Sequence, residues 1–379
     1  MKLRVGTALF GLGVLFLVIA VGVPLYVAPA VTKLPYDLPK TTSTAQANNA
    51  RFLQIAVVDG SVKIDIPQAT LESTVEVIPN AKDTVDRLPK KLRGEAVIWD
   101  VYQTVKRTDR DEMISQYSTQ LALYRVSGEA APWKEQWLNE DGAEKTPTGN
   151  VTYSGQVYKF PFDTQKMNYR VFDRDLKRSL PAKYIGTETI DGIEVYRFEQ
   201  RIVDEPLATP EESLTTLLGR FAPEATSGRL LYSNTRTLWV EPMTGTYIKV
   251  REQQRKVLVP DNGTETILLD ADFNSTKESI SNSLKTVREN RFKLNLIGVY
   301  LPFAAAVLGL AALVVGLLMV LRHNTAAAAA PPRRDDDDTL EMSHSGPLTD
   351  ELPSATHNWR TDDPTVPNPR QAPGEVEQR

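Results

Sequence analysis

The sequence of 379 residues predicts a mainly β, α+β protein in which a large antiparallel domain is flanked by two membrane-spanning helices. Three observations predict this fold class. A long apolar segment lies near each end of the chain, apolar and polar residues alternate over many short runs between them, and turn dipeptides such as Asp-Gly separate these runs. Alternation with a period of two is typical of half-buried strands, so we expect a curved antiparallel sheet or a partial barrel.

The two apolar segments, residues 5–27 and 296–321, are each predicted to cross a membrane. Both exceed the roughly 20 residues that span the hydrocarbon core of a bilayer. Ala28-Pro29-Ala30 resembles a signal-peptide cleavage site. The apolar run before it is longer than the roughly 7–15 residues of a signal-peptide core, which favours an uncleaved anchor in the plasma membrane.

Basic residues beside the apolar segments predict the orientation of the chain. Lys2 and Arg4 precede the first segment and Arg322 follows the second, so we expect both termini in the cytoplasm and residues 31–292 outside it. A basic group just before the second segment opposes this orientation, and we interpret it as a contact with anionic lipid headgroups. Its members are Lys285, Arg288, Arg291 and Lys293.

The last segment of the chain, residues 322–379, is rich in Pro and charged residues and poor in large apolar ones. Such a composition buries too little apolar surface to offset the loss of chain entropy on folding. We therefore predict a disordered cytoplasmic tail.

The domain at residues 31–292 is predicted to be a meander of strands. Turn signals at Asp59-Gly60, Asp191-Gly192 and Met243 to Gly245 predict hairpins. The expected strands are 50–58, 61–66, 95–107, 113–126, 156–162, 183–188, 193–202, 229–240, 247–259 and 264–272.

Two helices are predicted in or beside this domain. For the first, Thr209 is the expected N-cap, with Pro210 at the first helical position and Glu212 completing a capping box. For the second, Ser275 and Glu278 form the same pattern, and the helix continues into the second membrane segment. The first helix carries one apolar stripe, Leu214, Leu217, Leu218 and Phe221.

Composition excludes several chemistries from the folded domain. The chain has no Cys, and its three His residues, His323, His344 and His357, all follow the second apolar segment. Cys nucleophiles, His-based triads and the usual zinc sites therefore have no side chains to use. We expect no enzyme activity, no metal and no cofactor. The net charge of −4 offers no basic surplus for a nucleic-acid partner.

Aromatic and apolar residues of the predicted strands and of the first helix are the candidate ligand contacts. A packed sheet core explains the same pattern, and the helix at 210–221 is either permanently packed on the sheet or a lid over a lipid site. The candidates for lipid contact are Trp99, Tyr102, Tyr196, Phe198, Trp239, Leu214, Leu217, Leu218 and Phe221.

Three longer phrases resemble the actinobacterial family named porin PorA, and the resemblance extends from Met1 to about Leu321. They are "GQVYKFPFDTQKMNYRVFDRDL" (Gly155 to Leu176), "YIGTETIDGIEVYRFEQ" (Tyr184 to Gln200) and "RTLWVEPMTGTYIKVRE" (Arg236 to Glu252). The resemblance implies a cell-envelope protein of high-GC Gram-positive bacteria, with a link to lipoglycan maturation or transport. The layout of a β domain between two spanning helices also resembles the eukaryotic scavenger receptors, which carry lipid.

The leading hypothesis from the sequence is that the outer β domain binds or transfers a membrane lipid or glycolipid. The first alternative is a non-catalytic scaffold for envelope glycosyltransferases, with envelope-biosynthesis proteins as partners. The second alternative is a porin, although spanning helices are not a feature of transmembrane β-barrels.

Overall fold

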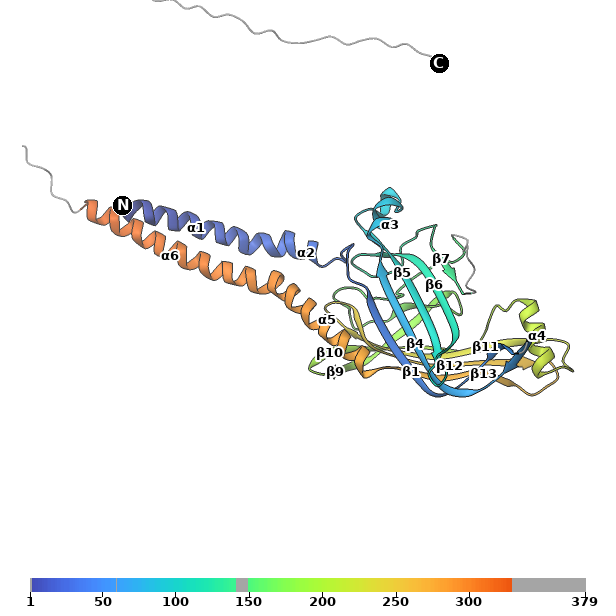
Figure 1. The fold of residues 1–379 in the computed structure, drawn as a ribbon. Helices are drawn as coiled ribbons and strands as arrows, with labels where there is room; N and C mark the ends of the chain where they lie inside the picture. Colours follow the sequence, from blue (N-terminus) through green and yellow to red (C-terminus); the bar gives the residue numbers. More distant parts are fainter. Residues whose placement is uncertain (1, 59, 141–148, 329–379) are drawn as a thin grey trace, which may run out of the picture. The chain divides into compact units, whose positions relative to one another are not determined.

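Antiparallel strands dominate the middle of the chain, and long apolar helices lie at both ends (Figure 1). The computed structural model describes residues 2–58, 60–140 and 149–328. The mainly β fold class with terminal helices, predicted from the sequence, is confirmed.

The main sheet has 11 strands in the order β7-β6-β5-β4-β1-β13-β12-β11-β10-β9-β8 and curls into a half-barrel. All its neighbouring strands pair antiparallel. The strands are β1 (Thr41–Phe52), β4 (Gln68–Pro79), β5 (Ala96–Arg107), β6 (Glu112–Tyr124), β7 (Trp137–Asn139), β8 (Tyr169–Asp173), β9 (Arg178–Ile190), β10 (Ile193–Pro206), β11 (Gly228–Glu241), β12 (Thr246–Pro260) and β13 (Thr266–Ser275). A separate hairpin pairs β2 (Gln54–Val58) with β3 (Ser61–Asp65).

Short bridges link the two edges of the curled sheet. Gln156 pairs with Val171 of β8 on one side and with Glu129 on the other, and Ala130 then pairs with Leu123 of β6. These residues connect β8 to β6 through isolated bridges and not through a continuous ladder of backbone hydrogen bonds. The sheet therefore encloses an interior, as a partial barrel does.

The helices are α1 (Lys2–Gly22), α2 (Ala28–Val31), α3 (Ala81–Asp86), α4 (Glu211–Phe221), α5 (Lys277–Asn295) and α6 (Leu301–Ala328). Short helical segments of other types are η1 (Val23–Val27), η2 (Lys90–Leu92) and η3 (Leu296–Tyr300). The helical stretches Arg4–Val31 and Lys277–Arg322 are long and apolar enough to cross a membrane. Of the predicted tail, residues 329–379 lie outside the described residues.

Glycines allow α1 and α6 to approach closely. A Cβ atom on Gly13 would lie 2.7 Å from the Leu313 backbone nitrogen, and one on Gly316 would lie 2.7 Å from the Phe10 nitrogen. Because residues early in α1 meet residues late in α6, the two helices run antiparallel. Small residues at such contacts are typical of helix pairs in membranes, where packing replaces the hydrophobic effect.

Local turn and strand predictions are partly confirmed. The β9–β10 turn has positive φ at Asp191 (48°) and Gly192 (78°), as the Asp-Gly signal predicts. In the predicted Asp59-Gly60 turn, Asp59 lies outside the described residues. Strands β4 and β8 were not predicted, whereas the predicted strand 156–162 is wrong. Its Phe160 N–H bonds to the Gly245 carbonyl in the β11–β12 turn instead of to a neighbouring strand.

Both predicted helix caps are wrong by one residue. Helix α4 begins after Pro210, which makes no side-chain cap, and the Thr209 hydroxyl donates to the Leu207 carbonyl. Helix α5 is capped by Thr276, whose side-chain oxygen accepts from the Ser279 N–H at 3.2 Å. Ser275 is still part of β13, where its hydroxyl accepts from the Val250 N–H, so it is not free to cap.

Candidate functional site

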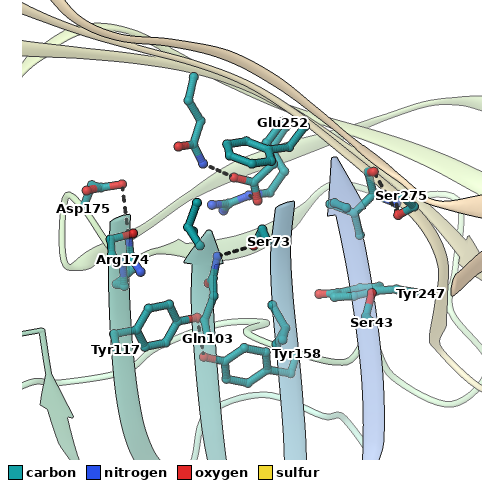
Figure 2. A pocket seen from close by; sticks show the side chains of 18 of the residues that line it. Ser43, Ser73, Gln103, Tyr117, Tyr158, Arg174, Asp175, Tyr247, Glu252 and Ser275 are labelled. Atoms are coloured by element: carbon teal, nitrogen blue, oxygen red, sulfur yellow. Dashed lines mark hydrogen bonds and ion pairs between the residues drawn. The ribbon is translucent and has the colours of Figure 1, made fainter. Parts of the chain in front are cut away.

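The candidate site is a cavity of about 860 Å³ inside the curled sheet. Alternation along the strands turns every second residue inward, and these residues form its wall. On β4 the inward residues are Leu71, Ser73, Val75 and Val77, and β5, β6, β11 and β12 contribute further ones (Figure 2). A packed core would need apolar side chains over the whole inner face of the sheet. The polar residues on that face therefore distinguish this space from a packed core.

One end of the cavity is apolar and is covered by α4. Leu217 of α4 is buried and lines the cavity. Leu214, Leu218 and Phe221 pack beside it in one cluster with residues of β11, β12 and β13. The apolar stripe predicted from the sequence therefore faces the sheet. Other apolar lining residues at this end are Phe52, Leu53, Leu207, Leu230 and Leu268.

The middle of the cavity is crossed by tyrosines and amides. The hydroxyls of Tyr117 and Tyr158 lie 3.3 Å apart and point toward each other (Figure 2). The Arg174 guanidinium lies 4.3 Å from the centre of the Tyr117 ring. Nearby, the Gln103 amide donates to the Ser73 hydroxyl at 2.8 Å. Burial raises the pKa of both tyrosines, so they remain neutral donors and acceptors at pH 7.

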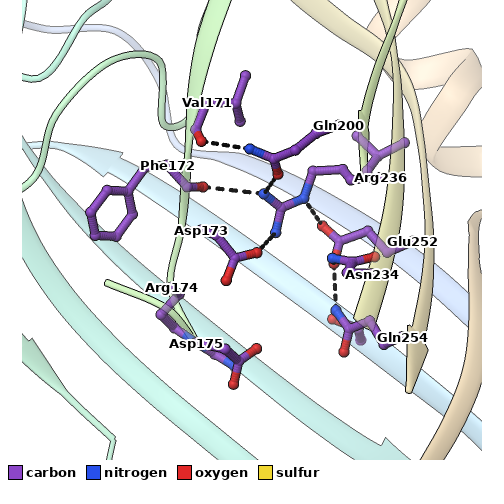
Figure 3. Close-up of polar contacts among 12 residues, drawn as sticks. Val171, Phe172, Asp173, Arg174, Asp175, Gln200, Asn234, Arg236, Glu252 and Gln254 are labelled. Atoms are coloured by element: carbon purple, nitrogen blue, oxygen red, sulfur yellow. Dashed lines mark hydrogen bonds and ion pairs between the residues drawn. The ribbon is translucent and has the colours of Figure 1, made fainter. Parts of the chain in front are cut away.

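A charged network on the β8–β12 wall surrounds Arg236 (Figure 3). Its guanidinium donates to Glu252 at 2.7 Å and to Asp173 at 3.2 Å. It also donates to the Gln200 side-chain oxygen at 2.9 Å and to the Phe172 carbonyl at 3.1 Å. The guanidinium thus links β8, β10, β11 and β12 through a single side chain.

Electrostatics in this network favour charged pairs. Burial alone would raise the pKa of Glu252, but the charge of Arg236 and its hydrogen bond hold that pKa below the ordinary value. For Asp173, which is fully buried, burial outweighs the attraction of Arg236 and raises the pKa. Beside them Lys256 pairs with Asp175 at 2.5 Å. Each cation of the network therefore faces at least one carboxylate.

The other end of the cavity is polar and lies beside α5. Asn282, Ser283 and Thr286 of α5 line it, with Thr41 to Ser43 at the start of β1. Thr41, Thr42, Ser43, Asn282 and Thr286 are all exposed to solvent. This end is therefore the mouth of the cavity.

Only Leu217 of the residues predicted to contact lipid lines the cavity. Trp99 and Phe198 are buried in two separate cores, and Tyr196 packs against the second of them. Trp239 packs against α5, whereas Tyr102 is 45% exposed.

The predicted headgroup contacts lie on α5. Arg288 pairs with Asp191, and Arg291 lies 3.7 Å from Glu241. Lys285 and Lys293 are exposed. Two of the four side chains thus hold α5 against turns of the sheet.

The network residues Arg236 and Glu252 were not singled out from the sequence. A signal existed, because the run "REQQRK" at 251–256 places polar residues on both faces of a strand. Such a strand cannot have a fully apolar inner face, which indicates a polar interior.

Together, the fold and the cavity define a mainly β protein with long apolar terminal helices and a partly polar interior. The chain belongs to the PorA family, whose family model, described as Porin PorA, matches residues 5–318. Among curated proteins it is similar to a "Porin PorA" of Corynebacterium resistens, with 24% identity over 86% of this chain and 98% of that protein. It is also similar to a "Porin PorA" of Corynebacterium amycolatum, with 23% identity over 83% of this chain and 98% of that protein.

These comparisons correct the leading hypothesis from the sequence. The expectation of lipid or glycolipid binding and transfer, with its lipoglycan assignment, is wrong, because the relatives are named as porins. The expectation of a family resemblance is confirmed. The terminal apolar helices and the family together indicate a membrane or cell-envelope protein.

Proposed function

We propose that this protein is a porin that lets small hydrophilic solutes cross an envelope membrane and that it acts without catalysis. The observation that carries the proposal is the cavity of about 860 Å³ in a chain of the PorA family. Its wall carries hydrogen-bonding groups that can replace part of a solute's hydration shell. A solute entering a dry apolar interior would lose its water without compensation.

The solvent-exposed mouth beside α5 supports the same proposal. A conduit needs an entrance at which hydrated solutes meet polar side chains, and Asn282 and Thr286 supply them. The 11-stranded half-barrel does not close into a continuous barrel as outer-membrane barrels do, and two apolar helices anchor it. We further propose that the chain crosses the membrane twice, with both termini in the cytoplasm. Basic residues flank the end of each apolar helix that is farther from the β domain, and such residues favour the cytoplasmic side.

Thiol chemistry tests the conduit directly, because the natural chain has no Cys. Ser115 lines the cavity, whereas Gln116, the next residue of β6, lies on the opposite face of the strand, and both are exposed. Purified full-length Ser115→Cys and Gln116→Cys proteins are inserted separately into planar bilayers. A bulky thiol reagent added after current is established should lower the single-channel conductance of the Ser115→Cys protein only.

Folding is not at issue in this design, because each protein is its own control before the reagent is added. Absence of channel activity in the unmodified full-length protein would contradict the porin proposal. Conductance that the reagent leaves unchanged in Ser115→Cys would show that the current does not pass through this cavity.

A further inference from the structure

Helix α4 and helix α5 border opposite ends of the cavity (Figure 1). Strand β11 begins at Gly228, where an added Cβ would lie 3.0 Å from Leu218 of α4. The same strand ends at Glu241, whose carboxylate lies 3.7 Å from Arg291 of α5. The polar mouth beside α5 and the apolar end beneath α4 are therefore separated by the length of a strand.

Helix α4 is an insertion between two neighbouring strands. Strand β10 ends at Pro206, and its neighbour β11 begins at Gly228. The first connecting segment is anchored by Leu207, whose N–H donates to the carbonyl of a β11 residue at 2.9 Å. The second is anchored by Ser227, whose carbonyl accepts from the Asp261 N–H at 3.0 Å. Because the chain leaves and re-enters the sheet at the same end, α4 can move away without breaking a strand pair.

A single side chain forms the polar contact between α4 and another element. Among the residues that the structure describes, Arg220 is the residue of α4 that donates hydrogen bonds outside the helix. Its Nε donates to the Ile64 carbonyl of β3 at 2.8 Å, and its guanidinium lies 3.4 Å from the Asp65 carboxylate. Both charged side chains are exposed, and exposed ion pairs are weak. We call Arg220, Ile64 and Asp65 the α4 latch.

The apolar contacts of α4 are also limited. Leu217 and Leu218 are buried, whereas Leu214 and Phe221 are only partly buried. The helix also contains Gly219 in its interior, where an added Cβ would meet no atom within 4 Å. An interior glycine without such a packing reason lowers the stability of a helix. Elements with few buried apolar contacts and exposed hydrogen bonds open before the rest of a domain unfolds.

We propose that α4 is a gate that closes the end of the cavity opposite to the mouth. When the α4 latch breaks, α4 moves away from the sheet and the cavity is open at both ends. This role of α4 rests on the proposed porin function and describes how its conduit opens. With α4 in place, Leu217 and the apolar residues beneath it exclude water from this end. Apolar constrictions of this kind gate a pore by dewetting.

The first test measures the exposure of the covered end with a thiol reagent. Leu268 lines the cavity in the α4 cluster and is 4% exposed, so a thiol in the Leu268→Cys protein reacts slowly while α4 is in place. In the full-length protein, adding Arg220→Ala should raise this reaction rate roughly threefold, as expected for the loss of an exposed ion pair. Adding Arg251→Ala, which breaks an exposed ion pair between β12 and β13, should leave the rate unchanged. Entry of the reagent through the mouth is the same in both proteins and does not affect the comparison.

A second reporter separates a movement of α4 from a general loosening of the domain. Ala122 is fully buried in a core that contains no residue of α4. Arg220→Ala should therefore leave the reaction rate of the Ala122→Cys protein unchanged. An unchanged rate at Leu268→Cys, or an equal rise at both reporters, would overturn the gate.

A reversible crosslink tests the gate in a conducting protein. The full-length protein with Arg220→Cys and Asp65→Cys is inserted into a planar bilayer, and a short bis-methanethiosulfonate reagent joins the two thiols. The crosslink should abolish most of the current, and a reductant that cleaves it should restore the current. The control pair, Arg251→Cys with Asp272→Cys, joins β12 to β13 and should leave the current unchanged. A current that persists after α4 is crosslinked to β3 would contradict the gate.

The thiol rates need no channel activity, so the gate and the porin function can fail separately. Absence of conductance in every protein, together with a faster reaction at Leu268→Cys after Arg220→Ala, would contradict the porin function and leave the movement of α4 standing. Conductance that is insensitive to the crosslink would leave the porin function standing and contradict the gate.

Discussion

The charged network around Arg236 lies on the cavity face of β12, whereas Lys249 lies on the opposite face of the same strand. In the network each cation faces carboxylates within a largely buried wall, and Asp173 is fully buried. Lys249 is half-buried, pairs directly with Trp239 of β11, and has its ammonium 4.3 Å from the centre of that indole ring. Burial and pairing together therefore decide how much a charge contributes to the stability of the fold.

The largest expected effect comes from breaking the network. Arg236→Met leaves Asp173 and Glu252 without their buried cation, which typically costs about 3–5 kcal/mol. Urea unfolding of the purified protein, followed by tryptophan fluorescence, measures this loss. The control is Arg251→Met, because the Arg251–Asp272 pair is about two-fifths exposed on each side and contributes about 0–1 kcal/mol. Equal losses for the two variants would contradict the contrast between buried and exposed charge.

The apolar end of the cavity gives the next effect. Leu217→Ala removes a buried side chain of α4 that lines the cavity, and we expect a loss of about 2 kcal/mol, at the low end for Leu→Ala because the space beside it is already open. Thr215→Ala on the exposed face of α4 should change the free energy of unfolding by less than about 0.5 kcal/mol. Denaturant unfolding compares the two, and a neutral Leu217→Ala would show that Leu217 contributes little to the packing of α4 on the sheet.

Lys159 is buried and forms no salt bridge among the residues that the structure describes, so it should make the stability of the protein depend on pH. Its ammonium donates to the carbonyls of Phe160 and Thr244, and burial lowers its pKa from 10.5 to about 7. The unfolded chain binds this proton more strongly, so the free energy of unfolding should rise with pH between about 7 and 10.5, by about 1.4 kcal/mol per pH unit from this group.

Lys159→Met removes the titrating group, so its unfolding profile over the same pH range should be flatter than that of the natural protein. Lys183→Met, at an exposed position, should retain the natural slope. Parallel profiles for Lys159→Met and the natural protein would contradict the assignment of a neutral buried lysine.

The smallest effect on stability is expected at Lys249. Lys249→Gln should change the free energy of unfolding by less than about 0.5 kcal/mol, because Lys249 forms no ion pair with a carboxylate among the residues that the structure describes. A loss above 1 kcal/mol in urea unfolding would instead place Lys249 among the residues that hold the fold.

Local patterns in the sequence predicted the helices and strands more accurately than the residues that line the cavity. The alternation in "EAVIWDVYQTVKR" predicted β5, and the stripe of Leu214 to Phe221 predicted α4 and its buried face. Strand β4 was missed although "QATLESTVEVIP" has the same alternation. Gln156 to Phe162 was predicted as a strand, although only Gln156 pairs with β8 and Phe160 bonds to the β11–β12 turn. The aromatic residues predicted to contact lipid are mostly core residues, because alternation alone does not tell a packed face from a cavity wall.

The sequence by itself determined the two apolar helices, the antiparallel β class and the exclusion of His- and Cys-based chemistry from the domain. These properties depend on composition and on short-range periodicity, which any stretch of chain carries with it. The tertiary structure decided which inward-facing residues meet. Arg236 and Asp173 are 63 residues apart, and Thr41 and Thr246 lie on strands separated by β13. Only the order and unequal lengths of the strands bring the network together and leave the mouth of the cavity open beside α5.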